Sequence, residues 1–483
     1  MKKISKIIDI LKSKWLRDTG KTIILIAIIV ALFIGINILV SNIDPKDIDL
    51  TKNQLYTLSE ETKERIQALP ESDKIQIYMF DFDEQAILVD LIKQYERINE
   101  NISVEVVKVQ DRPDLASKYN VEAGYFTIII VNGEKSKMYT TNDFYSYDSI
   151  AGQEVDITEQ RMTSGIISVS SIGQITPVYA LTGHEEINTK SLMFYFSTYL
   201  ELENYELKTL DLLSAGDVPE DCKVLMIASP KKDFTEKETN AIKAYIEKGK
   251  NILWLNDPYS AKEEMPNVKS ILDMYGVNIR QDGIVTEQDK EKMLYESPNL
   301  IFPRVNNTSI TDKIEQVLLL YTGKLEFADN IDDLGVVRTD ILTTSENSFF
   351  RTDIENTSRT PVDGETVGAS VVGAILEKYV GEEGKSSKLI VYANNTFAAD
   401  TAVYSTSSAR AAIAFYQNKD LIINSVQYAA EIEDPITIRK TVNSTMYTAT
   451  LTQDRIIKYI IFGFPVLIIG AGIVVWQLRR RKQ

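Results

Sequence analysis

Two long apolar segments, one near each end of the chain, constrain this sequence more than any other feature. Residues 22–41 and 459–477 are largely apolar, and each has about the 18 to 20 residues that a helix needs to cross a membrane. Seven cations lie in the tail of residues 1–21 and four in the tail of residues 478–483. Because basic flanks stay in the cytoplasm, the pattern predicts a two-pass protein of the cell membrane. Both termini would be cytoplasmic, with roughly 410 central residues outside.

The charge of the chain narrows the classes of partner. The formal net charge is −16, and because both ends are basic, the part between the two apolar segments is more acidic than the whole. Such a surface repels nucleic acid and anionic lipid head groups, so we expect no nucleic-acid partner. The single cysteine, Cys222, cannot form an intramolecular disulfide, so the central part must be stabilised by its own core.

The first central block, residues 42–172, has the pattern of a small α/β domain. Thr57 and Glu60 have the spacing of a capping box and predict the start of a helix. Predicted elements then alternate between strand and helix, over residues 74–80, 84–98, 103–109, 114–121 and 125–133. This order indicates a thioredoxin-like layer, but the block contains no Cys-x-x-Cys motif, so redox chemistry is not expected. We interpret it as a docking or spacer domain.

The second block, residues 173–435, predicts a larger α/β domain. Nearly continuous apolar runs predict buried strands at residues 175–183, 224–230, 251–258 and 388–397. Helical patterns alternate with them, including residues 235–250, which Thr235 is expected to cap, and residues 419–432. The alternation indicates a doubly wound parallel sheet. The less regular residues 261–385 are an insertion or a mixed α/β extension of this domain, and residues 436–458 are a linker.

Several motifs in a fixed order resemble one family. They include YTLSEETKERIQAL, LTGHEE, VLMIASPKKDFTEKETNAIKAYIEKGKNILWLNDP, YANNTFAAD, NKDLIINSVQYAAE and ITIRK, followed by the apolar C-terminal segment. Together they resemble the gliding-motility-associated ABC transporter auxiliary component family over nearly the full length. The resemblance implies a flavodoxin-like, glutamine-amidotransferase-like sheet in the second domain. It also implies a non-enzymatic, substrate-binding-like subunit that needs no cofactor and acts beside an ABC permease and an ATP-binding subunit in the lipid bilayer.

Polar residues follow several of the predicted strands of the second domain. His184, the only histidine, and Glu185 come after the first strand, Ser229 after the second, Asp257 after the third and Asn395 after the fourth. Open α/β sheets bind ligands at the carboxyl ends of their strands, so these five residues predict a polar ligand pocket. The alternative is that the His184 ring caps a loop or binds a backbone carbonyl. One histidine beside carboxylates provides too few ligands of the usual zinc type, so no metal is expected.

Catalysis would need a nucleophile that the motifs do not supply. Cys222 precedes a predicted strand and should lie at the opposite edge of the sheet from His184, and no G-x-S-x-G motif occurs. No P-loop motif occurs either, so the chain is not the ATPase of its own transporter.

Two functions stay open. One is a non-enzymatic auxiliary subunit that presents an extracytoplasmic domain next to a permease. The other is a membrane-tethered hydrolase of cell-envelope material that uses His184 with a carboxylate. As an exposed loop residue, His184 should be replaceable by alanine without loss of the fold.

Overall fold

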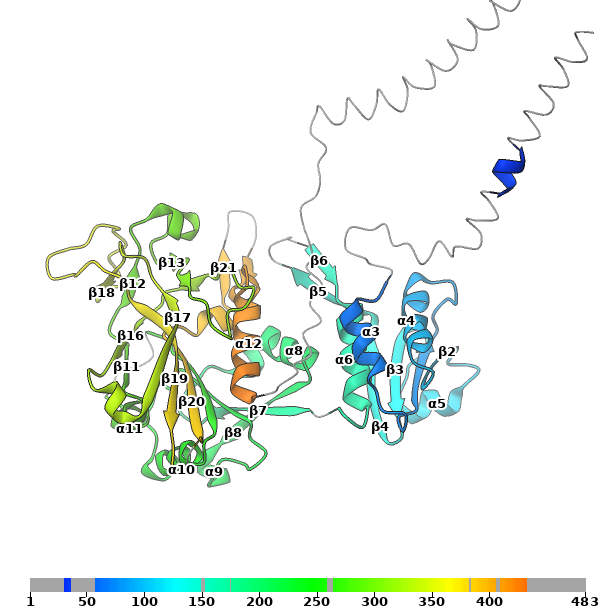
Figure 1. Ribbon diagram of the computed structural model, residues 1–483, viewed down its shortest axis with the longest axis horizontal. Helices are drawn as coiled ribbons and strands as arrows, with labels where there is room; N and C mark the ends of the chain where they lie inside the picture. Colours follow the sequence, from blue (N-terminus) through cyan, green and yellow to red (C-terminus); the bar gives the residue numbers. More distant parts are fainter. Residues whose placement is uncertain are drawn as a thin grey trace, which may run out of the picture. The chain divides into compact units, whose positions relative to one another are not determined.

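A computed structural model describes seven stretches of the chain: residues 30–35, 57–148, 153–173, 175–258, 264–381, 384–404 and 409–431. Within these residues the chain is mixed α/β, with one four-stranded sheet and one ten-stranded sheet (Figure 1). The two sheets have separate hydrophobic cores, one drawn from residues 58–169 and the other from residues 178–430. The predicted boundary between two domains at residues 172 and 173 stays a prediction.

The smaller sheet has the strand order β2-β1-β3-β4. Its strands are β1 (Ile75–Phe80), β2 (Ile102–Val107), β3 (Thr127–Asn132) and β4 (Lys135–Thr140). Strands β1 and β2 are parallel, whereas β3 is antiparallel to both β1 and β4. Side chains alternate across a strand, so Ile75, Ile77 and Met79 share one core while Phe80 joins the core on the other face.

Helices cover both faces of this small sheet. They are α3 (Glu60–Gln67), α4 (Ile87–Ile98), α5 (Pro113–Lys118) and α6 (Thr158–Val169), with a hairpin of β5 (Tyr145–Asp148) and β6 (Gln153–Asp156) before α6. Residues of α3, α4 and α6 pack with Ile77, and residues of α5 pack with Phe80. The N-cap of α3 is Ser59 and not the predicted Thr57. Glu159 of α6 accepts hydrogen bonds from the Ser59 amide and hydroxyl, both 2.6 Å long, so a tertiary contact fixes where this helix starts.

Five parallel strands form one half of the larger sheet, in the order β8-β7-β9-β10-β20. They are β7 (Thr176–Thr182), β8 (Tyr205–Asp211), β9 (Val224–Ala228), β10 (Asn251–Leu255) and β20 (Ser386–Tyr392). The rest of the sheet comes from the chain between β10 and β20. It consists of β11 (Val277–Arg280), β14 (Arg304–Val305), β16 (Lys324–Phe327), β17 (Val336–Thr343) and β19 (Val371–Tyr379). The described strands between β10 and β20 therefore extend the same sheet in antiparallel register. The predicted insertion or extension at residues 261–385 stays a prediction.

Helices pack on both faces of the larger sheet. On one face lie α8 (Phe194–Leu202) and α12 (Asn418–Ala430), and on the other lie α10 (Glu236–Glu247) and α11 (Pro266–Leu272). Strands β9 and β10 are buried along their whole length, which explains the apolar runs at residues 224–228 and 252–255. Each fully buried apolar side chain of this kind contributes about 1.5–3 kcal/mol to folding.

Shorter elements complete the description. Two short helices flank the edge strand, α7 (Thr189–Leu192) and α9 (Leu212–Ala215). Three two-stranded pairs are β12 (Ile284–Thr286) with β18 (Phe349–Arg351), β13 (Leu300–Ile301) with β15 (Leu319–Leu320), and β21 (Ala402–Tyr404) with β22 (Ala409–Ala411). The 3-10 helices are η2 (Thr141–Phe144), η3 (Asp273–Tyr275), η4 (Lys290–Lys292), η5 (Leu294–Glu296), η6 (Ile331–Leu334), η7 (Thr396–Ala398) and η8 (Ala412–Ala414).

The prediction of a membrane-anchored fold with two transmembrane helices needs correction. Among the residues that the structure describes, no helix combines the length and the apolar character that crossing a membrane requires. Of the first predicted span only residues 30–35 are described, and six helical residues are about 9 Å long, against a hydrocarbon core of about 30 Å. The second predicted span, the linker and both basic tails lie outside the described residues. The two-pass topology and the location at the cell membrane are therefore not supported.

Candidate functional site

The loops that follow β7 and β9 meet at the carboxyl edge of the larger sheet. Gly183, the first residue after β7, has a backbone φ of +124°, a value that residues with a side chain rarely adopt. This turn directs the His184 carbonyl toward the second loop. There the carbonyl accepts hydrogen bonds from the amides of Lys231 at 2.8 Å and Lys232 at 3.2 Å. The backbone itself thus ties the two loops together.

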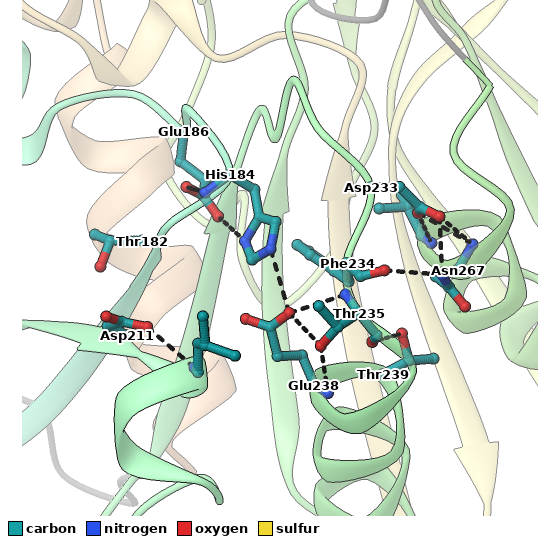
Figure 2. A network of polar contacts seen from close by, with 12 residues as sticks. Thr182, His184, Glu186, Asp211, Asp233, Phe234, Thr235, Glu238, Thr239 and Asn267 are labelled. Atoms are coloured by element: carbon teal, nitrogen blue, oxygen red, sulfur yellow. Dashed lines mark hydrogen bonds and ion pairs between the residues drawn. The ribbon is translucent and has the colours of Figure 1, made fainter.

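The His184 imidazole lies between two buried carboxylates (Figure 2). Its Nδ1 is 3.5 Å from Oε1 of Glu186, and its Nε2 is 3.3 Å from Oε2 of Glu238 on α10. The side chain of His184 is 11 % exposed, and those of both glutamates are 2 % exposed. The Phe234 ring meets the imidazole edge-on, with 4.9 Å between ring centroids. We call His184, Glu186 and Glu238 the histidine–glutamate clamp.

Both glutamates of the clamp have further hydrogen bonds. Glu186 Oε2 accepts the amide of His184 at 2.7 Å. Glu238 Oε2 accepts the amide of Thr235 at 2.9 Å and its hydroxyl at 2.6 Å, while Thr235 Oγ1 accepts the amide of Glu238. This reciprocal pair is a capping box at the start of α10, which confirms Thr235 as the predicted cap. The clamp therefore joins the β7 loop to the first turn of α10.

The two carboxylates favour the protonated form of the histidine. The contact with Glu186 is the largest cause that raises the pKa of His184, and the charge of Glu238 adds to it, while burial acts in the opposite direction. An imidazolium whose two nitrogens both face carboxylates has no lone pair with which to accept a proton. Below this raised pKa the arrangement is a buried ion-pair network, in which neither ring nitrogen is available as a general base.

Two of the other predicted site residues form a second, separate group. Ser229 is buried with a backbone φ of +57°, and its hydroxyl accepts a hydrogen bond from the Asn395 amide at 2.8 Å. The amide of Ser229 donates to the Leu255 carbonyl at 2.8 Å. The structure therefore brings Ser229 and Asn395 together and links both to the end of β10. In this group the polar atoms hold the loops in place.

Glu185 and Asp257 have other neighbours. Glu185 is exposed and pairs with Lys232 Nζ at 2.8 Å, and this hydrogen-bonded lysine lowers the pKa of the Glu185 carboxyl. Asp257 is half-buried, and its backbone carbonyl accepts the side-chain amide of Asn256 at 3.1 Å. Ser229 and Asn395 are thus joined by a direct hydrogen bond, whereas Glu185 pairs with a lysine outside the predicted set.

Sequence reasoning missed two members of the clamp. Glu186 is not among the five residues of the predicted ligand pocket, although its side chain is buried beside the His184 ring. Glu238 is the fourth residue of a T-x-x-E capping box, but no sequence signal places it beside His184. Cys222 is fully buried, with its sulfur 3.5 Å from the Tyr245 hydroxyl, and burial raises the pKa of its thiol to about 11. No cluster among the described residues has the His, Cys, Asp and Glu side chains to hold a metal ion.

These observations define a mixed α/β domain in which hydrogen bonds and ion pairs hold together the loops at the carboxyl edge of the larger sheet. A sequence profile described as "ABC-type uncharacterized transport system" matches residues 176–425. The match spans more than half of the chain, so the chain belongs to this family and is an auxiliary component of an ABC-type transport system. The narrower gliding-motility family is not shown.

Two solved structures are similar to parts of this chain. A structure titled "mmIFT52 N-terminal domain" is 14% identical, covers 53% of this chain and 99% of that chain, and has a TM-score of 0.37. The NTD_N/C domain of the alkylhydroperoxide reductase AhpF from Enterococcus faecalis is 12% identical, covers 33% of this chain and 82% of that chain, and has a TM-score of 0.18. Both TM-scores are too low to inform function. No curated protein matches the chain.

Proposed function

We propose that this protein is a non-enzymatic auxiliary, substrate-binding-like subunit of an ABC transport system, and that it acts by contact with a permease and an ATP-binding subunit. The histidine–glutamate clamp is the observation that carries the non-enzymatic part. His184 is the only histidine of the chain, and both of its ring nitrogens face buried carboxylates. A hydrolase of the alternative kind would need this ring as a base beside a nucleophile.

The hydroxyl and thiol groups near this sheet support the same conclusion. The Ser229 hydroxyl is buried against the Leu255 carbonyl and the Asn395 amide. The Cys222 thiol is buried and its pKa is raised, so it is protonated at neutral pH and a poor nucleophile. Membership of the transport family supports a role in binding rather than in chemistry.

The finer parts of this function are also proposals. Glu185 is the member of the predicted ligand set whose side chain is exposed, so it is the residue that a ligand would reach first. The link to the gliding-motility-associated family rests on the order of the sequence motifs, among them LTGHEE and YANNTFAAD.

Affinity purification of the full chain from its native cells, after mild crosslinking, tests the subunit role. We expect a multi-span permease and a P-loop ATPase to co-purify with it. An unrelated tagged protein of similar charge is the control. Failure to recover either partner would overturn the subunit role. A second assay tests the purified chain for ester or glycoside hydrolysis. Hydrolysis that disappears in a His184→Gln variant would overturn the proposal that the subunit is non-enzymatic.

A further inference from the structure

Strand β8 forms one edge of the larger sheet. Among the described residues it pairs with β7 alone, in parallel register from Tyr205 opposite Thr176 to Asp211 opposite Thr182. Alternate residues of an edge strand direct their N–H and C=O groups away from the sheet, where a further strand can bind them. A strand of seven residues offers such groups over about 23 Å.

A groove of about 560 Å³ lies beside β8 and is lined by residues of β7, β8, α7 and α8. Leu207, Lys208 and Thr209 of β8 line it, together with Lys190 of α7 and Phe194 and Ser197 of α8. The size is within the range of about 300–1,000 Å³ that is typical of binding sites. The groove therefore places a shaped surface directly beside unpaired strand backbone.

The groove is cationic on a strongly acidic protein. Its charged lining residues are Lys190 and Lys208, and no aspartate or glutamate lines it, although the chain carries a net charge of −16. Lys208 Nζ lies 3.3 Å from Glu206, while no ion pair in the described part of the chain involves Lys190. Opposite charge on a partner is the complement that would match these two lysines.

An apolar contact point lies in the same groove. The Phe194 side chain is 61 % exposed at the first residue of α8, where Asp400 holds its backbone amide at 2.6 Å. Leu207 of β8 is half-buried and packs partly on the domain core. A peptide in extended conformation directs alternate side chains to opposite faces, so one face can meet Phe194 and Leu207 while main-chain groups pair with β8.

We propose that the β8 groove binds an extended, acidic segment of a partner protein, which adds to the sheet beside β8 and pairs its carboxylates with Lys190 and Lys208. A second copy of this chain fits less well, because the same two lysines would face one another. A small anion would leave the strand edge and Phe194 without a role. The proposal does not depend on the transport function of the chain.

Peptide binding to the full chain tests this proposal by fluorescence anisotropy. The probe is a fluorescein-labelled peptide of alternating glutamate and valine. One control peptide has lysine in place of glutamate. Two further controls keep the glutamate–valine sequence but carry N-methyl groups on the backbone of every second residue, one peptide on the odd and the other on the even positions. We expect the acidic peptide to bind, the basic one to bind at least about tenfold more weakly, and at least one N-methylated phase to lose about tenfold in affinity. Equal binding of acidic and basic peptides, or full binding of both N-methylated phases, would overturn the proposal.

Variants locate the binding site. The double change Lys190→Glu and Lys208→Glu should weaken acidic-peptide binding by about tenfold or more, whereas Lys237→Glu on α10, which does not line the groove, should not change it. Phe194→Ala changes an exposed residue and should independently reduce the affinity for the acidic peptide. Circular dichroism checks that each variant is folded. Three outcomes would each refute an acidic segment as the partner. They are unchanged peptide binding in both groove variants, competition for the groove by inorganic phosphate alone, and self-association of the chain that is lost in the double variant.

Discussion

Replacing His184 with alanine should destabilise the larger domain, in contrast to what an exposed loop residue would do. The substitution leaves Glu186 and Glu238 buried without the cation between them. Removing one partner of a fully buried ion pair costs about 3–5 kcal/mol. Here the ring lies 3.3 and 3.5 Å from the carboxylates, and each glutamate keeps a backbone amide as a donor. We therefore expect a loss of about 2–3 kcal/mol in the free energy of unfolding at about pH 6.

The pH dependence follows from the raised pKa of His184. A histidine whose folded-state pKa lies above its unfolded value of 6.5 binds its proton more tightly in the folded state. The stabilisation from this proton is complete below the unfolded pKa and disappears as the pH rises through the folded pKa. The difference between the wild type and His184→Ala should thus be larger at about pH 6 than at about pH 9.

Urea unfolding followed by tryptophan fluorescence measures this difference. Trp254 lies fully buried in β10, so replacing Trp15 and Trp476 with phenylalanine makes it the sole reporter of the larger sheet. Glu185→Gln is the matched control, because this exposed neighbour should change the stability by less than about 0.5 kcal/mol. A loss below about 0.5 kcal/mol in His184→Ala, or a loss of equal size at both pH values, would refute the buried ion-pair network.

Three further predictions concern buried polar groups. Arg351 is fully buried and donates to both carboxylate oxygens of Glu365 at 2.8 and 2.9 Å. Arg351→Met should therefore lower the free energy of unfolding by about 3–5 kcal/mol and speed amide hydrogen exchange in residues 354–365. Cys222, with its pKa raised to about 11 by burial, should react with a disulfide reagent at about pH 8 only after denaturation, and rapid reaction of the native chain would contradict its burial. The side-chain amide of Asn418 donates to the carbonyls of residues 318 and 412, both at 2.9 Å. Asn418→Asp should therefore lower the free energy of unfolding by about 2–4 kcal/mol in the same urea assay. An unchanged free energy of unfolding would exclude these hydrogen bonds.

Local pattern was enough to place most strands and helices. The run at residues 224–230 became β9 (Val224–Ala228), because both faces of this strand are covered and every residue is apolar. Thr235 caps α10 as predicted, and Glu238 completes the capping box. Strand β8 was missed, since its sequence YELKTLD carries the charged residues that suit an edge strand and hide the apolar alternation.

The candidate site was less accessible to sequence reasoning than the fold. His184 was correctly placed after a strand, but its partners come from a position two residues away and from a helix more than fifty residues later in the chain. Nothing in a single sequence reports that Glu186 turns inward while its neighbour Glu185 turns to solvent. That difference arises from the loop conformation, in which Glu185 has a backbone φ of +60°.

The position of β20 next to β10 has a consequence for the order in which the larger domain is made. Ile252 pairs with Leu389 and Leu255 with Tyr392, so the central strand of the sheet waits for a neighbour that a ribosome synthesises more than 130 residues later. The Asn251 side chain also binds the Lys388 amide and the Ala429 carbonyl, which closes the same region only when α12 has emerged. Contacts between such distant parts of the chain slow folding. During synthesis, the part of β9 and β10 that α12 covers therefore stays open to solvent and to chaperones until this helix has emerged.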